Sequence, residues 1–384
     1  MIDLSKTILT VLVSCGYCLS ACLYGQTTVD GSFIFGNTVR NYRLYIPAAY
    51  DPAQPVPLVL NLHGYGSNNL EQEFYGDFRP IADTANFIIV HPNGTIDALN
   101  KRFWNTFGTS TVDDIGFLSA LIDTISSEYA IDQNRIYSTG MSNGGFMSYE
   151  LACFLSERIT AVASVAGTMI TSHLNSCNPY HPTPVMHIHG TADGTVPYDG
   201  NLLFVGVIDL LQYWVQFNNC MVMPEITTLP DIDPNDGCTA ERHYYSGGNA
   251  GSAFDLYRIL EGGHSWPGAP INLNVTNMDF SASLTIWNFF RKFRLDELTT
   301  GIADHYTSSS LFSVYPNPSH GHIKLYFNDF NQRDIIVTNV FGQLIMQFES
   351  CSPVSEFFLK EKGVYMITVI RDRYIQTEKI VVNQ

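Results

Sequence analysis

The chain has 384 residues, of which 45% are hydrophobic, and a formal net charge of −16. A chain of this length and apolar content can bury a large core and form two domains, which excludes an intrinsically disordered protein. The negative charge argues against nucleic acid and anionic membrane surfaces as partners, because both would repel it. A neutral polymer or a small ester is compatible with this charge.

The N-terminal residues 1–25 are predicted to be a secretory signal peptide. An apolar stretch follows Lys6 and ends in small residues near Gly25. This pattern is typical of a signal peptide rather than of a membrane span. Two processing sites compete: ordinary cleavage near Gly25, which we favour, and lipidation at Cys22 after a lipobox-like segment.

Residues 26–295 alternate strand-like and helix-like runs, which predicts an α/β domain with a doubly wound, mostly parallel sheet. The strand-like runs are apolar and uninterrupted, as is typical of buried parallel strands. The expected strands are 42–46, 58–62, 87–90, 135–138, 161–165, 185–188 and 254–259, and the expected helices are 115–128, 145–157, 203–218 and 281–293.

The C-terminal part of the chain differs in character. Residues 296–310 are polar and turn-rich, which predicts a linker. Residues 311–384 carry seven basic and seven acidic side chains, so the net charge of −16 belongs to the residues before them. Short alternating runs at 323–327, 335–339, 365–370 and 378–382 predict a small antiparallel β-sandwich without obvious catalytic residues.

Five cysteines lie beyond the predicted signal peptide. An exported protein can oxidise them, and their spacing alone does not fix the pairing. We favour the short-loop pairs Cys153–Cys177 and Cys220–Cys238, which would leave Cys351 over. These spacings do not match a zinc site, so structural disulfides or buried thiols are expected.

A G-x-S-x-G pattern, Gly140-Met141-Ser142-Asn143-Gly144, lies between a strand-like and a helix-like run. In this context the serine sits on a tight turn that lifts its hydroxyl clear of the sheet. The glycines are needed because neighbouring elements pack closely there. The alternative is an ordinary Gly/Ser-rich loop, but the flanking elements favour Ser142 as a nucleophile.

A serine nucleophile requires a histidine base and a carboxylate that holds this histidine in the right tautomer. Asp193 follows the expected strand 185–188, and His264 follows the expected strand 254–259. The order Ser, Asp, His along the chain is that of the α/β-hydrolases. We therefore expect Ser142, Asp193 and His264 to form a catalytic triad.

Other residues compete for these roles. Asp199 lies further from the strand end, and Asp113 and Asp114 precede the nucleophile and are placed to cap a helix, so Asp193 is favoured as the acid. His187 and His189 have strand spacing and face one side. They suggest a metal pair, but no third ligand follows them, so buried structural histidines are expected.

The developing oxyanion needs backbone N–H donors. His63-Gly64-Tyr65-Gly66 closes the expected strand 58–62 and is similar to the H-G-x-G turn that supplies one of them. We expect the amides of Tyr65 and Asn143 to form the oxyanion hole, with Gly64 as their neighbour.

Two tryptophans near these motifs are candidates for substrate binding. We expect Trp104 and Trp266, together with Gly64 and Tyr65, to contact the substrate. The alternative for these aromatic side chains is packing within the protein.

Together these motifs resemble those of the polyhydroxybutyrate depolymerase and feruloyl/acetylxylan esterase group. The resemblance implies an α/β-hydrolase fold, Ser142 as nucleophile, Asp193 as acid, His264 as base, and neither a cofactor nor a metal. The segments that carry it are His63-Gly64-Tyr65-Gly66, Pro92-Asn93-Gly94, Val112-Asp113-Asp114-Ile115-Gly116-Phe117, Gly140-Met141-Ser142-Asn143-Gly144-Gly145, His189-Gly190-Thr191-Ala192-Asp193, Val196-Pro197-Tyr198 and Gly263-His264-Ser265-Trp266-Pro267-Gly268.

The C-terminal segment resembles the sorting domain of the type IX secretion system. This resemblance implies the type IX machinery as a partner, export across both membranes of a Gram-negative cell, and release or surface attachment. The alternative is a small β-sandwich that binds carbohydrate or another polymer. The motifs concerned are Val314-Tyr315-Pro316-Asn317-Pro318-Ser319, Val340-Phe341-Gly342-Gln343, Lys362-Gly363-Val364-Tyr365 and Lys379-Ile380-Val381-Val382.

The sequence thus predicts a secreted serine carboxylic-ester hydrolase. Feruloyl or acetyl esters of plant polysaccharide are the favoured substrates, and a polyhydroxybutyrate polymer is the next. A peptidase on the same triad is disfavoured by the lack of a propeller-sized N-terminal region. A non-catalytic surface binding protein on a hydrolase fold is the alternative from another class.

Overall fold

The computed structural model describes residues 26–271, 275–299, 312–327, 332–340, 342–371 and 374–383. The chain divides into two compact units, Met1–Gly301 and Ile302–Gln384, and each is described by itself. The predicted signal peptide, with the alternative lipidation site Cys22, lies outside the described residues.

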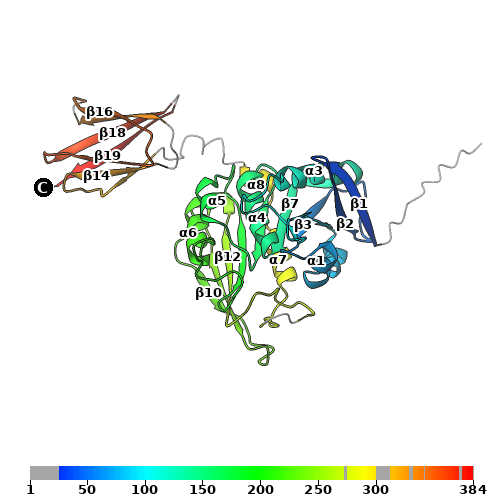
Figure 1. The fold of residues 1–384 in the computed structure, drawn as a ribbon. Helices are drawn as coiled ribbons and strands as arrows, with labels where there is room; N and C mark the ends of the chain where they lie inside the picture. The colour runs from blue at the N-terminus through cyan, green and yellow to red at the C-terminus, as the bar shows by residue number, and fades with distance from the viewer. Residues whose placement is uncertain are drawn as a thin grey trace, which may run out of the picture. The chain divides into compact units, whose positions relative to one another are not determined.

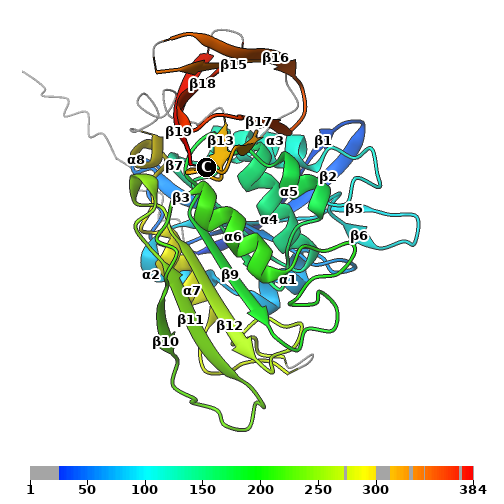
Figure 2. The same cartoon turned by 90° about the vertical axis from the view of Figure 1, so that its left-hand side faces the viewer.

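The first unit is built on a ten-stranded sheet in the order β1-β2-β4-β3-β7-β8-β9-β12-β11-β10 (Figures 1 and 2). Its six central strands are mutually parallel. They are β4 (Ile88–Pro92), β3 (Val56–Leu62), β7 (Ile131–Met141), β8 (Ala161–Val165), β9 (Val185–Gly190) and β12 (Phe254–Leu260). The expected mostly parallel sheet is therefore confirmed.

Antiparallel strands flank this parallel core on both sides. They are β1 (Thr27–Phe35), β2 (Thr38–Ile46), β11 (Thr239–Tyr245) and β10 (Glu225–Thr228). We expected residues 42–46 to form a parallel strand, and this prediction is wrong. These residues belong to β2, which pairs antiparallel with both β1 and β4. This strand returns from β1 through the two-residue turn Gly36–Asn37, whose residues both have positive φ as a tight hairpin requires.

Helices cover both faces of the sheet, as a doubly wound fold requires. On one face α3 (Asp114–Glu128), α4 (Asn143–Phe154) and α6 (Val207–Phe217) pack on the sheet, and on the other α2 (Arg79–Ala85) and α7 (Ala282–Phe290) do so. Shorter elements complete the unit: α1 (Asn69–Tyr75), α5 (Thr171–Ser176), α8 (Leu295–Thr299), η1 (Asn249–Gly251), β5 (Thr95–Ile96) and β6 (Arg102–Phe103).

The end of this unit differs from the expected boundary at residue 295. Helix α8 occupies the first residues of the predicted linker, and its Leu298 is buried in the core beside α7. The hydrophobic contact of Leu298 extends the unit through Thr299. The rest of the predicted linker, residues 300–310, lies outside the described residues.

Cysteine pairing is confirmed in one case and corrected in the other. Cys153 and Cys177 form a disulfide that joins α4 to the residue after α5. Cys220 and Cys238 are free and buried, and Cys351 is free and exposed. The predicted Cys220–Cys238 bond is wrong because the two thiols belong to separate hydrophobic clusters, which pack on opposite faces of the sheet.

The second unit is a β-sandwich, as expected. A three-stranded sheet contains β13 (Ser313–Tyr315), β14 (His322–Tyr326) and β17 (Val354–Phe358). A four-stranded sheet contains β16 (Leu344–Ser350), β15 (Arg333–Asn339), β18 (Gly363–Arg371) and β19 (Tyr374–Val382). Apolar side chains from both sheets form one core, which includes Ile323, Leu325, Ile335 and Ile367.

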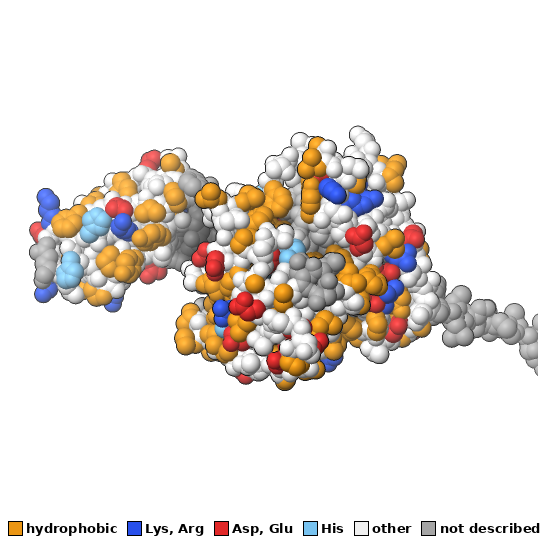
Figure 3. All heavy atoms as spheres, turned by 60° about the horizontal axis from the view of Figure 1, so that its bottom comes forward, with side chains coloured by type: hydrophobic (Ala, Val, Ile, Leu, Met, Phe, Trp, Pro, Cys, Tyr) orange, Lys and Arg blue, Asp and Glu red, His pale blue; other side chains and the backbone are white. Residues whose placement is uncertain are grey.

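None of the helices within the described ranges is both long and apolar enough to cross a membrane. On the visible face of the first unit, small groups of hydrophobic side chains are scattered among acidic, basic and other side chains (Figure 3).

Candidate active site

Ser142 lies at the turn between β7 and α4. Its backbone has φ 55° and ψ −122°, a region that non-glycine residues rarely occupy. The turn is fixed on both sides, because the Ser142 amide donates to Val165 O and its carbonyl accepts from the Phe146 amide. This strained strand-turn-helix conformation lifts the serine out of the sheet, as a nucleophile elbow does.

The glycines around Ser142 are required by close packing. A Cβ atom on Gly140 would come within 2.5 Å of Leu62 O, and one on Gly144 within 2.7 Å of His63 O. Both contacts involve the backbone of β3 and the loop after it, which cannot move aside cheaply. The G-x-S-x-G pattern thus allows α4 to pack against the end of β3.

Asp193 and His264 form a hydrogen-bonded pair. His264 Nδ1 lies 2.7 Å from Asp193 Oδ2, while Asp193 Oδ1 accepts from the Thr195 and Val196 amides at 2.8 Å each. Burial alone would raise the pKa of Asp193, but the neighbouring imidazoles of His189 and His264 outweigh it and leave this pKa well below its usual range. Asp193 is therefore an anion that orients the His264 ring.

The parallel sheet brings the candidate triad to one edge. Ser142 follows the carboxyl end of β7, and Asp193 and His264 follow the carboxyl ends of β9 and β12. The two loops are tied together, because the Ala192 amide donates to Gly262 O and the Glu261 amide donates to Thr191 Oγ1. Carboxyl ends of parallel strands form the usual ligand-binding edge of an α/β sheet.

The loop after β3 contacts the nucleophile turn. A Cβ atom on Gly64 would lie 3.5 Å from Ser142 Cβ, so Gly64 is the neighbour of the serine. His63 holds this loop, since its Nε2 accepts from the Gly94 amide and its Nδ1 therefore donates to Gly64 O. Burial lowers the pKa of His63 to about 4, which keeps the ring neutral.

This clamp determines where the Tyr65 amide points. In a trans peptide the C=O and the N–H point in opposite directions. Because Gly64 O faces the buried His63 ring, the Tyr65 N–H points away from that ring. The Tyr65 side chain is 48% exposed, and its hydroxyl donates to Asp97 Oδ2 at 2.6 Å.

The two tryptophans do not occupy the expected substrate-binding positions. Trp104 is 0% exposed and donates from Nε1 to His63 O, and Trp266 is 2% exposed and donates to Ser283 Oγ. Neither indole has surface left to contact a substrate, so the prediction of substrate contact is corrected to packing. Trp104 instead supports the loop after β3, because its Nε1 donates to His63 O.

The Asn143 side chain has a role that the sequence did not reveal. Its Oδ1 accepts from the Trp104 amide, and its Nδ2 donates to Trp104 O and to Thr106 Oγ1. Residue 143 therefore joins the nucleophile turn to the segment after β6. An asparagine directly after the nucleophile was a possible signal, because its amide can pair with a backbone segment in both directions.

Aromatic rings other than the tryptophans lie next to α4, the helix that follows Ser142. Phe107 and Phe204 are half-buried and contact each other at 6.0 Å between ring centroids. Both also contact Phe146, whose amide bonds to Ser142 O. These two rings come from loops far apart in sequence, so no local pattern could have paired them.

The aspartates that were alternatives to Asp193 as the triad acid have different contacts. Asp113 caps α3 by accepting from the Gly116 amide, and Asp114 is buried and forms an ion pair with Arg40 at 2.7 Å. Asp199 is exposed. His187 and His189 bond to each other, and the described residues contain no cluster of three or more His, Cys, Asp or Glu that would hold a metal ion.

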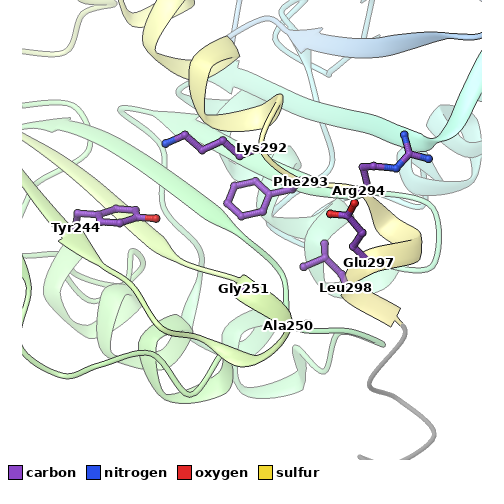
Figure 4. A pocket seen from close by; sticks show the side chains of 8 residues that line it. All are labelled: Tyr244, Ala250, Gly251, Lys292, Phe293, Arg294, Glu297 and Leu298. Carbon is purple, nitrogen blue, oxygen red and sulfur yellow. The ribbon is translucent and has the colours of Figure 1, made fainter.

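Two cavities differ in their relation to this site. One of about 190 Å³ is bordered by Gly194, Thr195, Glu261 and His264. Another of about 250 Å³ lies between β11, η1 and α8 (Figure 4). Its Arg294 pairs with Asp132 at the start of β7, about 30 Å along the strand from Ser142, so this cavity is remote from the candidate triad.

A doubly wound, mostly parallel sheet with a serine at this strained turn defines an α/β-hydrolase. The profile of the family described as Phospholipase/Carboxylesterase matches residues 44–227, and that of the Secretion system C-terminal sorting domain matches residues 313–383. The C-terminal unit is therefore a secretion sorting domain, and the chain is exported.

Relatives specify the family further. The chain is 30% identical to Feruloyl esterase C of Emericella nidulans over 65% of this chain and 83% of that protein. It is also 30% identical to Probable feruloyl esterase C of Aspergillus niger over 59% and 82%, and to the bifunctional acetylxylan esterase/xylanase XynS20E of Neocallimastix patriciarum over 41% and 22%. The chain belongs to the feruloyl and acetylxylan esterase family and is a carboxylic-ester hydrolase.

Proposed function

We propose that the protein hydrolyses esters through a Ser142–His264–Asp193 triad and an acyl-enzyme. His264 takes the proton of the Ser142 hydroxyl as Oγ attacks the ester carbonyl, and returns it to the leaving alcohol. Water then attacks the acyl-enzyme with His264 again as base, releasing the acid and free Ser142. Asp193 stays ionised and holds His264 in the tautomer that accepts at Nε2.

The observation that carries this proposal is the 2.7 Å bond between His264 Nδ1 and Asp193 Oδ2 at the sheet edge where Ser142 stands. When Nδ1–H of a neutral imidazole donates to a carboxylate, the other nitrogen, Nε2, carries the lone pair and can accept a proton. The low pKa of Asp193 keeps the carboxylate charged throughout the cycle, so it stabilises the imidazolium that forms.

The amides of Tyr65 and Asn143 are proposed as the oxyanion hole. Asn143 is the first residue of α4, so its N–H lacks an intrahelical partner and lies at the positive end of the helix. The His63 clamp on Gly64 O orients the Tyr65 N–H independently of the Tyr65 side chain. One such donor is worth about 3 to 4 kcal/mol of transition-state stabilisation.

Feruloyl or acetyl esters of plant polysaccharide are the proposed substrates. The half-buried rings of Phe107 and Phe204 beside the nucleophile helix offer an aromatic wall for a feruloyl group. The relatives named as feruloyl and acetylxylan esterases support the same choice. Type IX export across both membranes of a Gram-negative cell, proposed from the sorting domain, would deliver the enzyme to an extracellular polymer.

Kinetics with one pair of variants tests the reaction class. Ser142→Ala is expected to lower kcat for p-nitrophenyl acetate by several orders of magnitude, because the nucleophile is lost. Ser127→Ala, on the exposed end of α3, is the matched control and should keep parental activity. Parental activity in Ser142→Ala would exclude the proposal, and an inactive parent would favour the surface binding protein.

Substrate choice is tested by comparing methyl ferulate, acetylated xylan and polyhydroxybutyrate films. We expect turnover of one or both of the first two and little release from the film. Phe204→Ala is expected to lower kcat/KM for methyl ferulate by about 2- to 10-fold relative to p-nitrophenyl acetate, since it removes an aromatic contact. Preferential degradation of the film would overturn the proposed substrate class.

A further inference from the structure

A buried chain of hydrogen bonds runs from the nucleophile helix to the catalytic acid. Tyr149 OH lies 2.8 Å from His187 Nδ1, and His187 Nε2 lies 3.1 Å from His189 Nδ1. His189 Nε2 lies 2.8 Å from Val196 O and 3.3 Å from Asp193 Oδ2. The chain thus connects α4, through two residues of β9, to the carboxylate that also holds His264.

The direction of hydrogen-bond donation along this chain is set by its last acceptor, the carbonyl of Val196. Val196 O can only accept, so His189 Nε2 carries the proton. A neutral His189 then accepts at Nδ1 from His187 Nε2–H, and His187 in turn accepts at Nδ1 from the Tyr149 hydroxyl. Every hydrogen bond thus runs from Tyr149 toward the loop after β9, where the last one ends on Val196 O with Asp193 Oδ2 3.3 Å from the same nitrogen.

Neutral rings fit the surroundings. Tyr149, His187 and His189 are at most 1% exposed, and a charge on the His187 imidazole would be costly there. Burial, reinforced by His189, places the pKa of His187 well below its usual range. The 3.3 Å separation of His189 Nε2 from Asp193 Oδ2 is longer than that of a charge-assisted hydrogen bond, whereas 2.8 Å to Val196 O suits a neutral donor.

We propose that Tyr149, His187 and His189 are positioning residues that fix the orientation of Asp193, and through it that of His264. This inference rests on the proposed triad. His189 Nε2 lies beside Oδ2 at 3.3 Å and donates to the carbonyl of Val196, whose own amide donates to Oδ1. His189 therefore holds both the carboxylate and the loop that binds it. Val196 O fixes the tautomer of His189 and thereby that of His187, and the Tyr149 hydroxyl then donates to the remaining His187 nitrogen.

Nitrogen-15 NMR of histidine-labelled protein tests the chain without reference to activity. Both rings are expected as neutral Nε2–H tautomers, assigned by the loss of their signals in His187→Gln and His189→Gln. Tyr149→Phe should broaden or shift the His187 and His189 signals. A doubly protonated His189, or an Nδ1–H tautomer of His187, would overturn the proposed direction.

Kinetics of three variants tests the effect on catalysis. His189→Leu removes the N–H that binds Val196 O beside Asp193 and is expected to lower kcat roughly 10-fold or more with little change in KM, because Asp193 and His264 would be less well positioned. His189→Gln keeps an N–H donor and should recover most of that loss. Tyr149→Phe should lower kcat by a smaller factor, again with KM unchanged.

Tyr137→Phe is the matched control for Tyr149→Phe. Tyr137 is equally buried, and its hydroxyl donates to Phe293 O, outside the chain. Thermal unfolding of both variants reports any general loss of stability. Equal kcat in the two tyrosine variants, or equal loss in His189→Leu and His189→Gln, would overturn the positioning role. Parental activity in Ser142→Ala would instead reject the triad, while the NMR signals still decide whether the chain exists.

Discussion

The strained backbone at Ser142 predicts an unusual order of stability for substitutions at this residue. Glycine occupies φ 55°, ψ −122° without the Cβ strain that serine or alanine suffers. Such strain costs about 1 to 3 kcal/mol, and glycine loses about 0.4 to 1 kcal/mol through its more flexible unfolded chain. Ser142→Gly is therefore expected to be more stable than Ser142→Ala by roughly 1 kcal/mol, or about 2 to 4 °C in Tm.

Denaturant unfolding of the two inactive variants measures this difference directly. Ser119, in the middle of α3, provides the control with helical backbone. There the order should reverse, with the glycine variant about 1 kcal/mol less stable than the alanine variant. If Ser142→Gly is no more stable than Ser142→Ala while the Ser119 pair behaves as expected, the turn stores no strain and our account of it is wrong.

Three further changes have expected outcomes. Asp193→Asn should keep the fold but lower kcat by about 10³- to 10⁴-fold in ester hydrolysis assays, because His264 would be held in the wrong tautomer. Replacing Cys153 and Cys177 together by alanine removes a disulfide whose cysteines are 24 residues apart in sequence. This should lower the free energy of unfolding, measured by urea titration, by about 3.5 kcal/mol. An unchanged free energy of unfolding would show that the disulfide does not form. Burial lowers the pKa of His91 to about 3, so from pH 6.5 downwards the unfolded chain binds a proton that the folded chain does not. Protonation of the unfolded chain at His91 therefore lowers the free energy of unfolding by up to about 1.4 kcal/mol per pH unit as the pH falls toward 3. His91→Leu should reduce the slope of the free energy of unfolding against pH in this range. An unchanged slope would contradict the effect of burial on His91.

The central strands of the fold were predictable because buried parallel strands are continuous apolar runs. The edge strands were missed, since β10 is exposed along its length and β1 is mostly half-exposed or exposed. For the β1–β2 hairpin a usable signal existed in Gly36–Asn37, a two-residue pair that favours positive φ. Recognising that turn would have predicted that β2 runs antiparallel to β1.

The candidate site was predictable where the local chain dictates it. The strand-turn-helix context of Ser142 and the chain order of Asp193 and His264 are local or sequential signals. The burial of Trp104 and Trp266 is not, because an indole in a loop packs or binds according to which elements surround it. The contacts of Tyr149 with His187, like those of Phe107 with Phe204, join segments that only the tertiary fold brings together.

The role of Ser142 as the activated nucleophile is tested most directly by fluorophosphonate labelling of the folded protein, followed by peptide mapping. We predict a single adduct on Ser142 that forms far more slowly in His264→Ala, because the base is lost. An adduct on another residue, or none on the folded parent, would contradict the proposed triad.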